Sequence, residues 1–241
     1  STVEQANQRG LCVILDVHNY ATYRGKKIGS DEVPADAFVD LWKRLASAFD
    51  DPDKTIYGLM NEPAKIDIDQ WAPVAKETVK AIRKSGAKNI ILVAGGRWSG
   101  AHDWMKGSPS NADAFAELKD PQHRTWLEVH QYADPGFAGI KQDCIAPERL
   151  TKVLKRMTEW AHKNHQKLFL GEFGVPASEN CLAALDAMLA ETRDDDVWRG
   201  WTYWAMGRWW GKYPMSIQPQ EGRDAPQTAV LKKYFGRERD N

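Results

Sequence analysis

The chain has 241 residues, and its 33 basic and 33 acidic side chains give a formal net charge of zero. This length suits a domain with a sizeable core, and the balanced charge argues against nucleic acid or an anionic membrane as the main partner. No apolar run approaches membrane-spanning length and no leader peptide is visible, so we expect a cytoplasmic protein or a mature form without its leader. No linker or composition break interrupts residues 1–241, which we interpret as one domain.

Short apolar runs alternate with amphipathic helical patterns along the chain. After the first ten residues, which resemble the end of a helix capped at Gly10, the predicted strands are 11–17, 56–60, 90–94, 125–129, 168–170 and 197–204. The predicted helices between and after them are 38–49, 71–86, 147–160, 178–192 and a short one over 230–235. Nearly continuous apolar strands separated by helices indicate an α/β fold with a parallel sheet covered by helices.

Two α/β architectures fit this alternation, an open doubly wound sheet and a closed (β/α)8 barrel. No glycine-rich phosphate loop follows any predicted strand, which weakens the nucleotide-binding sheet. A barrel places its working residues at the carboxyl ends of several strands. Polar and aromatic side chains do follow the predicted strands, namely His18, Asn61, Glu62, Trp98, His130, Tyr132, Glu172 and Trp204. The barrel is therefore the favoured prediction.

Two of these residues form a pair that suggests a chemistry. Glu62 and Glu172 each follow an apolar run, and a buried carboxylate is costly unless it is paired or used. Cleavage of a glycosidic bond needs two such acids, and a separation of about 5 to 5.5 Å between them gives retention of configuration. Eleven tryptophans add flat faces that suit sugar rings, although tryptophan is more often a core residue.

Six motifs then resemble, in order, the strand-end motifs of glycoside hydrolase family 5, most closely its bacterial and fungal endo-β-1,4-glucanases. They are ILDVHNY, LMNEP, GGRWSGA, EVHQYAD, LGEFG and GWTYWAMGRWWG, and together they extend from about residue 10 to residue 211. The resemblance implies a (β/α)8 barrel of the TIM type and a retaining double displacement with neither cofactor nor metal. It implies Glu62 as acid/base and Glu172 as nucleophile. The implied substrate-binding residues are His18, Asn61, Trp98, His130, Tyr132, Trp204, Trp209 and Trp210.

The three cysteines fit neither a zinc spacing nor a thiol redox motif. We interpret Cys12, inside an apolar run, as a buried free thiol. Cys144 and Cys181 lie in polar segments where a disulfide can form, and the family resemblance implies that they are bonded. A disulfide favours secretion, and the absence of an N-x-S/T acceptor favours a bacterial source. His162 and His165 are interpreted as a solvated helix face rather than a metal site.

Two departures from the family pattern affect the prediction. Gly96-Arg97 stands where the family has glycine-asparagine, so the details of that subsite are open. Only six strand–helix pairs are visible where the barrel needs eight, so we expect a chain truncated at its N-terminus or a shortened barrel. The strands at 11–17 and 197–204 would then be open edges, which a second copy of the chain or the segment after Gly222 would cover. We prefer a homodimer, because that segment is short and highly charged.

The leading prediction is an extracellular endoglucanase that acts on β-1,4-glucan. A mannanase or a xylanase is an alternative, because these enzymes share the acid pair and differ in their subsites. A non-catalytic carbohydrate-binding relative is a further alternative, because a quarter of the barrel is not visible.

Overall fold

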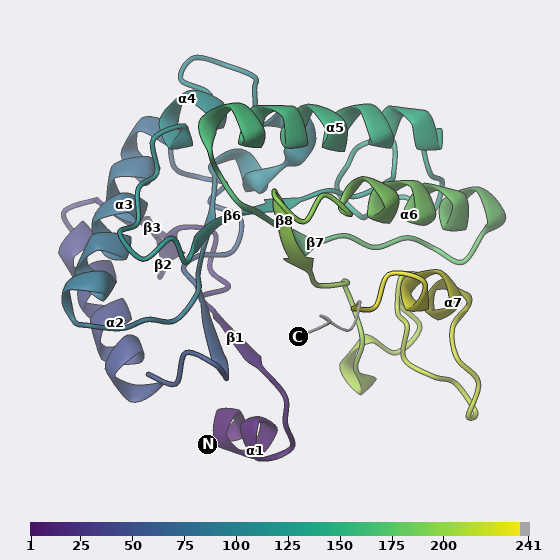
Figure 1. Cartoon of the computed structure of the whole chain (residues 1–241), viewed down its shortest axis with the longest axis horizontal. Helices are drawn as coiled ribbons and strands as arrows, with labels where there is room; N and C mark the ends of the chain where they lie inside the picture. The colour runs from purple at the N-terminus through teal and green to yellow at the C-terminus, as the bar shows by residue number, and fades with distance from the viewer. Residues whose placement is uncertain (237–241) are drawn as a thin grey trace. The chain divides into compact units, whose positions relative to one another are not determined.

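The computed structural model describes residues 1–236 of the chain (Figure 1). Its contacts divide it into two compact units: a first unit of Ser1–Val129 with Lys163–Phe169, and a second unit of His130–His162 with the residues from Leu170 onward. Among the helices of residues 1–236, none combines the length and the apolar character that crossing a membrane requires. The prediction of a single domain over 1–241 stays a prediction, and the last five residues of the segment after Gly222 lie outside the described residues.

The main sheet of the described residues has six strands in the order β1-β4-β5-β6-β7-β8. They are β1 (Val13–Asp16), β4 (Thr55–Gly58), β5 (Ile91–Ala94), β6 (Thr125–His130), β7 (Leu168–Glu172) and β8 (Trp198–Trp201). The register of the first four is parallel, with each strand beside the next in the chain. This succession of strand–helix pairs is that of a (β/α)8 barrel with six of its eight pairs, so the predicted α/β class and all six strands are confirmed.

The ends of this sheet are less buried than its middle. All four residues of β5 are buried, which agrees with its continuous apolar sequence, whereas β1 and β8 contain partly or fully exposed residues. Cys12, which precedes β1, is a free but exposed thiol, so the prediction of a buried core cysteine is wrong. Because β1 pairs only with β4 in the described sheet, no strand of that sheet covers its other side.

The first unit carries four helices, which are α1 (Thr2–Gln8), α2 (Ala35–Ala48), α3 (Ile68–Lys84) and the short α4 (Asn111–Phe115). Helices α2 and α3 lie side by side, in blue in Figure 1. Each helix contributes a fully buried tryptophan, whose indole N–H donates to a backbone carbonyl at the end of a strand or just beyond it. The indole of Trp42 donates to Leu59 O and that of Trp71 to Ala94 O. The helices thus fix the strand ends where the candidate residues follow.

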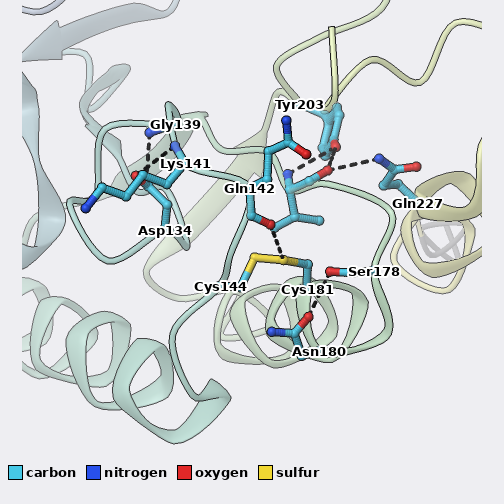
Figure 2. Close-up of a disulfide and its surroundings, with 11 residues drawn as sticks. Asp134, Gly139, Lys141, Gln142, Cys144, Ser178, Asn180, Cys181, Tyr203 and Gln227 are labelled. Carbon is cyan, nitrogen blue, oxygen red and sulfur yellow. Dashed lines mark hydrogen bonds between the residues drawn. A yellow bond between two sulfur atoms is a disulfide. The ribbon is translucent and has the colours of Figure 1, made fainter. Parts of the chain in front are cut away.

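The second unit carries α5 (Pro147–Asn164, whose last two residues belong to the first unit), α6 (Glu179–Glu191) and α7 (Pro226–Lys232). Helix α7 leads to Tyr234, whose hydroxyl donates to the backbone and side chain of Asp186 in α6. The Cys144–Cys181 disulfide also reaches α6, with 5.2 Å between the Cα atoms (Figure 2). The predicted disulfide is therefore confirmed.

Several short elements escape the sequence prediction. They are the hairpin of β2 (Thr22–Tyr23) and β3 (Lys26–Lys27), helix α4, and the 3-10 turns η1 (Arg97–Ser99), η2 (Ala101–Asp103) and η3 (Arg208–Trp210). The predicted solvated histidine face is at the end of α5, where His162 lies 2.7 Å from the carboxylate of Asp194. This exposed pair is an ordinary surface contact.

Candidate active site

Asn61 and Glu62 follow β4 in a tightly held turn. The Asn61 N–H donates to Val17 O at 3.0 Å, and Asn61 O accepts from Tyr20 N, so the loops after β1 and β4 are joined by backbone bonds. Asn61 is only 4% exposed, and its side-chain Nδ2 has no hydrogen-bond partner within the described residues. Such a buried donor costs about 1–3 kcal/mol. The unsatisfied Nδ2 of Asn61 therefore lowers the stability of the fold.

Glu62 itself has a left-handed backbone, with φ of +41°. A non-glycine residue in this region is strained by about 1–3 kcal/mol, and such strain gathers at functional sites because the surrounding structure maintains it. The buried Asn61 and Pro63 on either side hold the turn, and the Glu62 side chain is partly buried. The acid that the sequence singles out thus lies in a conformation that the chain does not adopt by preference.

His18 follows β1 and contacts two side chains of its own segment. Its Nδ1 lies 2.7 Å from Oδ2 of Asp16, and Tyr20 approaches Nε2 at 3.5 Å with its ring edge-on to the imidazole. The contact with the Asp16 carboxylate orients the imidazole ring. The imidazole is exposed, which suits a contact with a ligand.

Trp98 lies in a left-handed turn after β5, and its side chain is 57% exposed. Arg97, Trp98 and Ser99 all have φ near +54°, and the Ser99 hydroxyl accepts from Gly95 N and donates to Glu128 O. The Arg97 side chain, which departs from the family pattern, donates to Lys106 O at 2.9 Å. The hydrogen bonds of the Ser99 hydroxyl therefore fix the backbone of this turn, on which the Trp98 indole is exposed.

Two side chains of the second unit lie beside the carboxylate of Glu172, the last residue of β7. The Tyr132 hydroxyl donates to its Oε2 at 2.9 Å, and Nδ1 of His130 lies 3.7 Å from the same oxygen. Gln131 N donates to Glu172 O, so strand pairing continues to this point. All four of these residues are buried. A buried carboxylate with a fixed phenol and an imidazole beside it is oriented for chemistry.

Trp204, Trp209 and Trp210 follow β8 in one aromatic segment. Trp204 and Trp210 are packed edge to face with their ring centres 4.9 Å apart, and Tyr213 lies 5.2 Å beyond. Burial, together with the nearby charges of Glu172 and Asp134, raises the pKa of Tyr213. The Trp209 side chain is 92% exposed. A flat, exposed ring such as that of Trp209 suits the apolar face of a sugar.

A second set of bonds holds the segment that follows Glu172. The Tyr203 hydroxyl accepts from Val175 N at 3.2 Å and donates to Val175 O at 3.1 Å, and Gln227 Nε2 donates to the same carbonyl. The Trp204 N–H donates to Phe173 O. Sequence reasoning missed Gln227, because a glutamine on a short helix carries no signal of a bond 52 residues away.

The structure places eight of the ten predicted site residues at or within a few residues of strand ends, and it places Trp209 and Trp210 farther on, in η3. It groups His18, Asn61, Glu62 and Trp98 in the first unit, and His130, Tyr132, Glu172, Trp204, Trp209 and Trp210 in the second. Because Glu62 and Glu172 belong to different units, their separation of about 5 to 5.5 Å stays a prediction.

A parallel strand–helix fold with carboxylates, histidines and tryptophans at or beyond its strand ends is typical of (β/α)8-barrel proteins, whose sites lie at this end of the strands. The comparisons identify the family: residues 1–208 match the family described as Cellulase (glycosyl hydrolase family 5), and the chain belongs to that family.

Two curated relatives are fungal. Endoglucanase 1 of Robillarda sp. is 34% identical over 215 residues, which are 84% of this chain and 55% of that protein. Endoglucanase gh5-1 of Neurospora crassa is 33% identical over 235 residues, which are 96% of this chain and 58% of that protein. The chain therefore spans a little over half the length of these relatives.

Solved structures agree on the fold. An endo-β-1,4-glucanase of Xanthomonas axonopodis pv. citri is 44% identical with a TM-score of 0.93, over 97% of this chain and 75% of that one. XacCel5A, solved in complex with cellopentaose, is 47% identical with a TM-score of 0.92 over 97% and 76%. Pseudomonas stutzeri endoglucanase Cel5A, in complex with cellobiose, is 34% identical with a TM-score of 0.87 over 100% and 72%.

Proposed function

We propose that the protein is a retaining endo-β-1,4-glucanase that cleaves internal bonds of cellulose or a related β-glucan. The observation that carries this proposal is the buried Glu172 at the end of β7, held by the Tyr132 hydroxyl and faced by His130. Family membership supports the reaction class, and the cellopentaose bound by XacCel5A supports a β-1,4-glucan as substrate.

In the proposed mechanism Glu172 is the nucleophile and Glu62 the acid/base. The Glu172 carboxylate attacks the anomeric carbon while the bond to the leaving oxygen breaks and Glu62 gives that oxygen its proton. Glu62 then removes a proton from water, the water oxygen attacks the same carbon, and the ester to Glu172 breaks. Two inversions give net retention, and the two acids must lie about 5 to 5.5 Å apart.

The other predicted residues bind and orient the sugar. The unpartnered Nδ2 of Asn61 is the donor proposed for the 2-hydroxyl next to the cleaved bond, where a hydrogen bond strengthens in the transition state. His18 would contact the neighbouring sugar. Trp204 would form the platform at the cleavage site, with Trp98, Trp209 and Trp210 as outer platforms.

The disulfide supports the proposal that the protein acts outside the cell, because such bonds persist in oxidising compartments. The bacterial source expected from the sequence is not supported by the comparisons, which include both fungal and bacterial relatives.

The first experiment measures reducing-sugar release from carboxymethylcellulose, mannan and xylan. We expect release from carboxymethylcellulose, its loss in Glu172→Ala, and its persistence in Glu179→Ala, an exposed glutamate on α6 that serves as a matched control. Faster release of reducing sugar from mannan or xylan would indicate that this polysaccharide, rather than β-1,4-glucan, is the substrate. No release from any of the three would favour a non-catalytic binding protein.

A second experiment separates the roles of the two acids. With an aryl β-cellobioside, which has a good leaving group, Glu62→Ala should still form the glycosyl ester, and added azide should attack it to give a product of retained configuration. In Glu172→Ala, azide takes the place of the missing carboxylate and should give the inverted glycosyl azide. An inverted glycosyl azide from Glu62→Ala and a retained one from Glu172→Ala would instead identify Glu62 as the nucleophile and Glu172 as the acid/base.

A further inference from the structure

We propose that Asp134 and Gly139 are positioning residues, which hold the ring of Tyr132 and, through its hydroxyl, the carboxylate of Glu172. This inference rests on the proposed function, because it concerns the nucleophile of that reaction. Neither residue is among the site residues that the sequence indicates. All the contacts that carry the inference lie within the second unit.

Asp134 organises the loop that follows β6. Its carboxylate is buried at 2% exposure and accepts the Gly139 N–H at 2.8 Å and, more weakly, the Lys141 N–H at 3.4 Å (Figure 2). Its own carbonyl accepts from Phe137 N at 2.8 Å. A buried charge that accepts backbone N–H groups makes strong bonds, because the bonds replace its water shell. The carboxylate therefore fixes the path of the loop over residues 134–141.

Gly139 is the point where this loop meets Tyr132. Its φ of +68° is one that glycine adopts freely, and a Cβ built on it would lie 2.7 Å from two ring carbons of Tyr132. Real Cβ atoms do not approach a ring so closely. The backbone of Gly139 thus packs directly on the phenol, and only a residue without a side chain allows this contact.

The C-terminal end of this loop is also held in place. Ile145 N donates to Ala133 O and closes the loop at its base, and Cys144 is bonded to Cys181 of α6 (Figure 2). The loop is thus held at Asp134, at its base and at the disulfide. A ring packed under so constrained a segment has little freedom to rotate.

The consequence for the reaction follows from the 2.9 Å bond between Tyr132 and Glu172. A nucleophile must lie within a short range of the attacked carbon, and a misplacement of about 1 Å costs on the order of 10²-fold in rate. Displacement of the phenol removes or redirects the bond that orients the carboxylate. We therefore expect the loop to act on kcat rather than on the affinity for glucan.

The test compares two glycine variants. Gly139→Ala adds both backbone strain and the contact with the ring, whereas Gly222→Ala, at φ of +77° with no atom within 4 Å of its Cβ, adds the strain alone. We expect kcat of Gly139→Ala to fall on the order of 10²-fold with KM changed less than about threefold, and kcat of Gly222→Ala to change less than about twofold. Equal kcat values in the two variants would overturn the proposal.

A double-mutant cycle tests whether the effect passes through the phenol. In a Tyr132→Phe background no hydroxyl remains to be misplaced, so Gly139→Ala should lower kcat by less than about threefold more. If Gly139→Ala lowered kcat on the order of 10²-fold in the Tyr132→Phe background as well, the proposal would be overturned. A wild-type chain without glucanase activity would instead refute the proposed function, so the two failures are distinguishable.

Thermal unfolding shows whether Gly139→Ala folds. If it does not, variants of Asp134 test the same proposal. Asp134→Asn keeps a side-chain oxygen for the Gly139 N–H, whereas Asp134→Ala removes it. We expect kcat of the Asn variant within about threefold of wild type and that of the Ala variant at least about tenfold lower. Equal kcat values in these two variants would overturn the positioning role.

Discussion

The pair of Arg83 and Asp120 predicts a specific loss of stability in acid. Arg83 of α3 donates from Nε and Nη2 to the two oxygens of Asp120, each at 2.9 Å, and both side chains are almost fully buried. Asp120 also accepts from Thr125, the first residue of β6. Burial by itself raises the pKa of Asp120, but the bonds from Arg83, Gln122 N–H and Thr125 outweigh it and lower the pKa to about 2.

The magnitude follows from linkage. A pKa that falls from an ordinary 3.8 to about 2 on folding corresponds to about 2 kcal/mol. Because the pKa is lower in the folded state, this stability is fully present above pH 4 and is lost as the pH falls towards 2. Asp120→Asn removes the charge, so its deficit relative to wild type should be larger at pH 6 than at pH 2.5 by about 1.5 kcal/mol, because a part of the stabilisation remains at pH 2.5.

Urea unfolding at the two pH values measures this difference. Asp40→Asn is a matched control, because Asp40 forms an exposed pair with Arg44 at 2.7 Å on α2, and such pairs contribute only about 0–1 kcal/mol. We expect the control deficit to stay below about 1 kcal/mol at both pH values. A deficit of Asp120→Asn that is the same at pH 6 and pH 2.5 would refute the assignment of the stabilisation to the ionised carboxylate.

Three further predictions concern the candidate site and the sheet edges. Tyr132→Phe should lower kcat about 10-fold to 100-fold, because Glu172 loses the hydrogen bond that orients its carboxylate while His130 remains; an unchanged kcat would contradict this. Asn61→Ala should leave the free energy of unfolding within about 1 kcal/mol of wild type or raise it, since the substitution removes a buried Nδ2 donor that has no partner among residues 1–236, while activity falls; a large loss of stability would refute it. If a second copy covers the edge strands β1 and β8, light scattering at low concentration should give a dimer, and an active monomer would reject that prediction.

Apolar patterning predicts the elements with large buried faces. Residues 91–94 are apolar at every position and are buried at every position, so β5 is evident from sequence. The hairpin of β2 and β3 escapes prediction, because strands of two residues, one of them a lysine pair, carry no periodicity. Cys12 shows the limit of the method, since an apolar run does not reveal whether a neighbouring strand covers it.

For the candidate site, sequence predicts the identity of the residues better than their support. His130, Tyr132 and Glu172 follow strands in a recognisable order, and parallel strands bring their carboxyl ends to one edge. Nothing in the order of residues indicates that Gly139 packs on a phenol or that Gln227 binds a distant carbonyl. These contacts depend on the course of loops, which local propensity does not determine.

In the first unit, stability and chemistry are concentrated at opposite ends of the sheet. At the amino ends of the strands, two polar side chains have several partners: Asn89 Nδ2 donates to three carbonyls, among them Thr55 O at the start of β4, and Asp120 binds the start of β6, although Asn89 Oδ1 has no partner among residues 1–236. Beyond the carboxyl ends, Glu62 has a left-handed backbone, and the buried Nδ2 of Asn61 has no partner in the same part of the chain. Strained and unsatisfied groups persist only where the rest of the fold outweighs their cost. Substitutions at the amino ends should therefore reduce stability first, and substitutions beyond the carboxyl ends should reduce activity first.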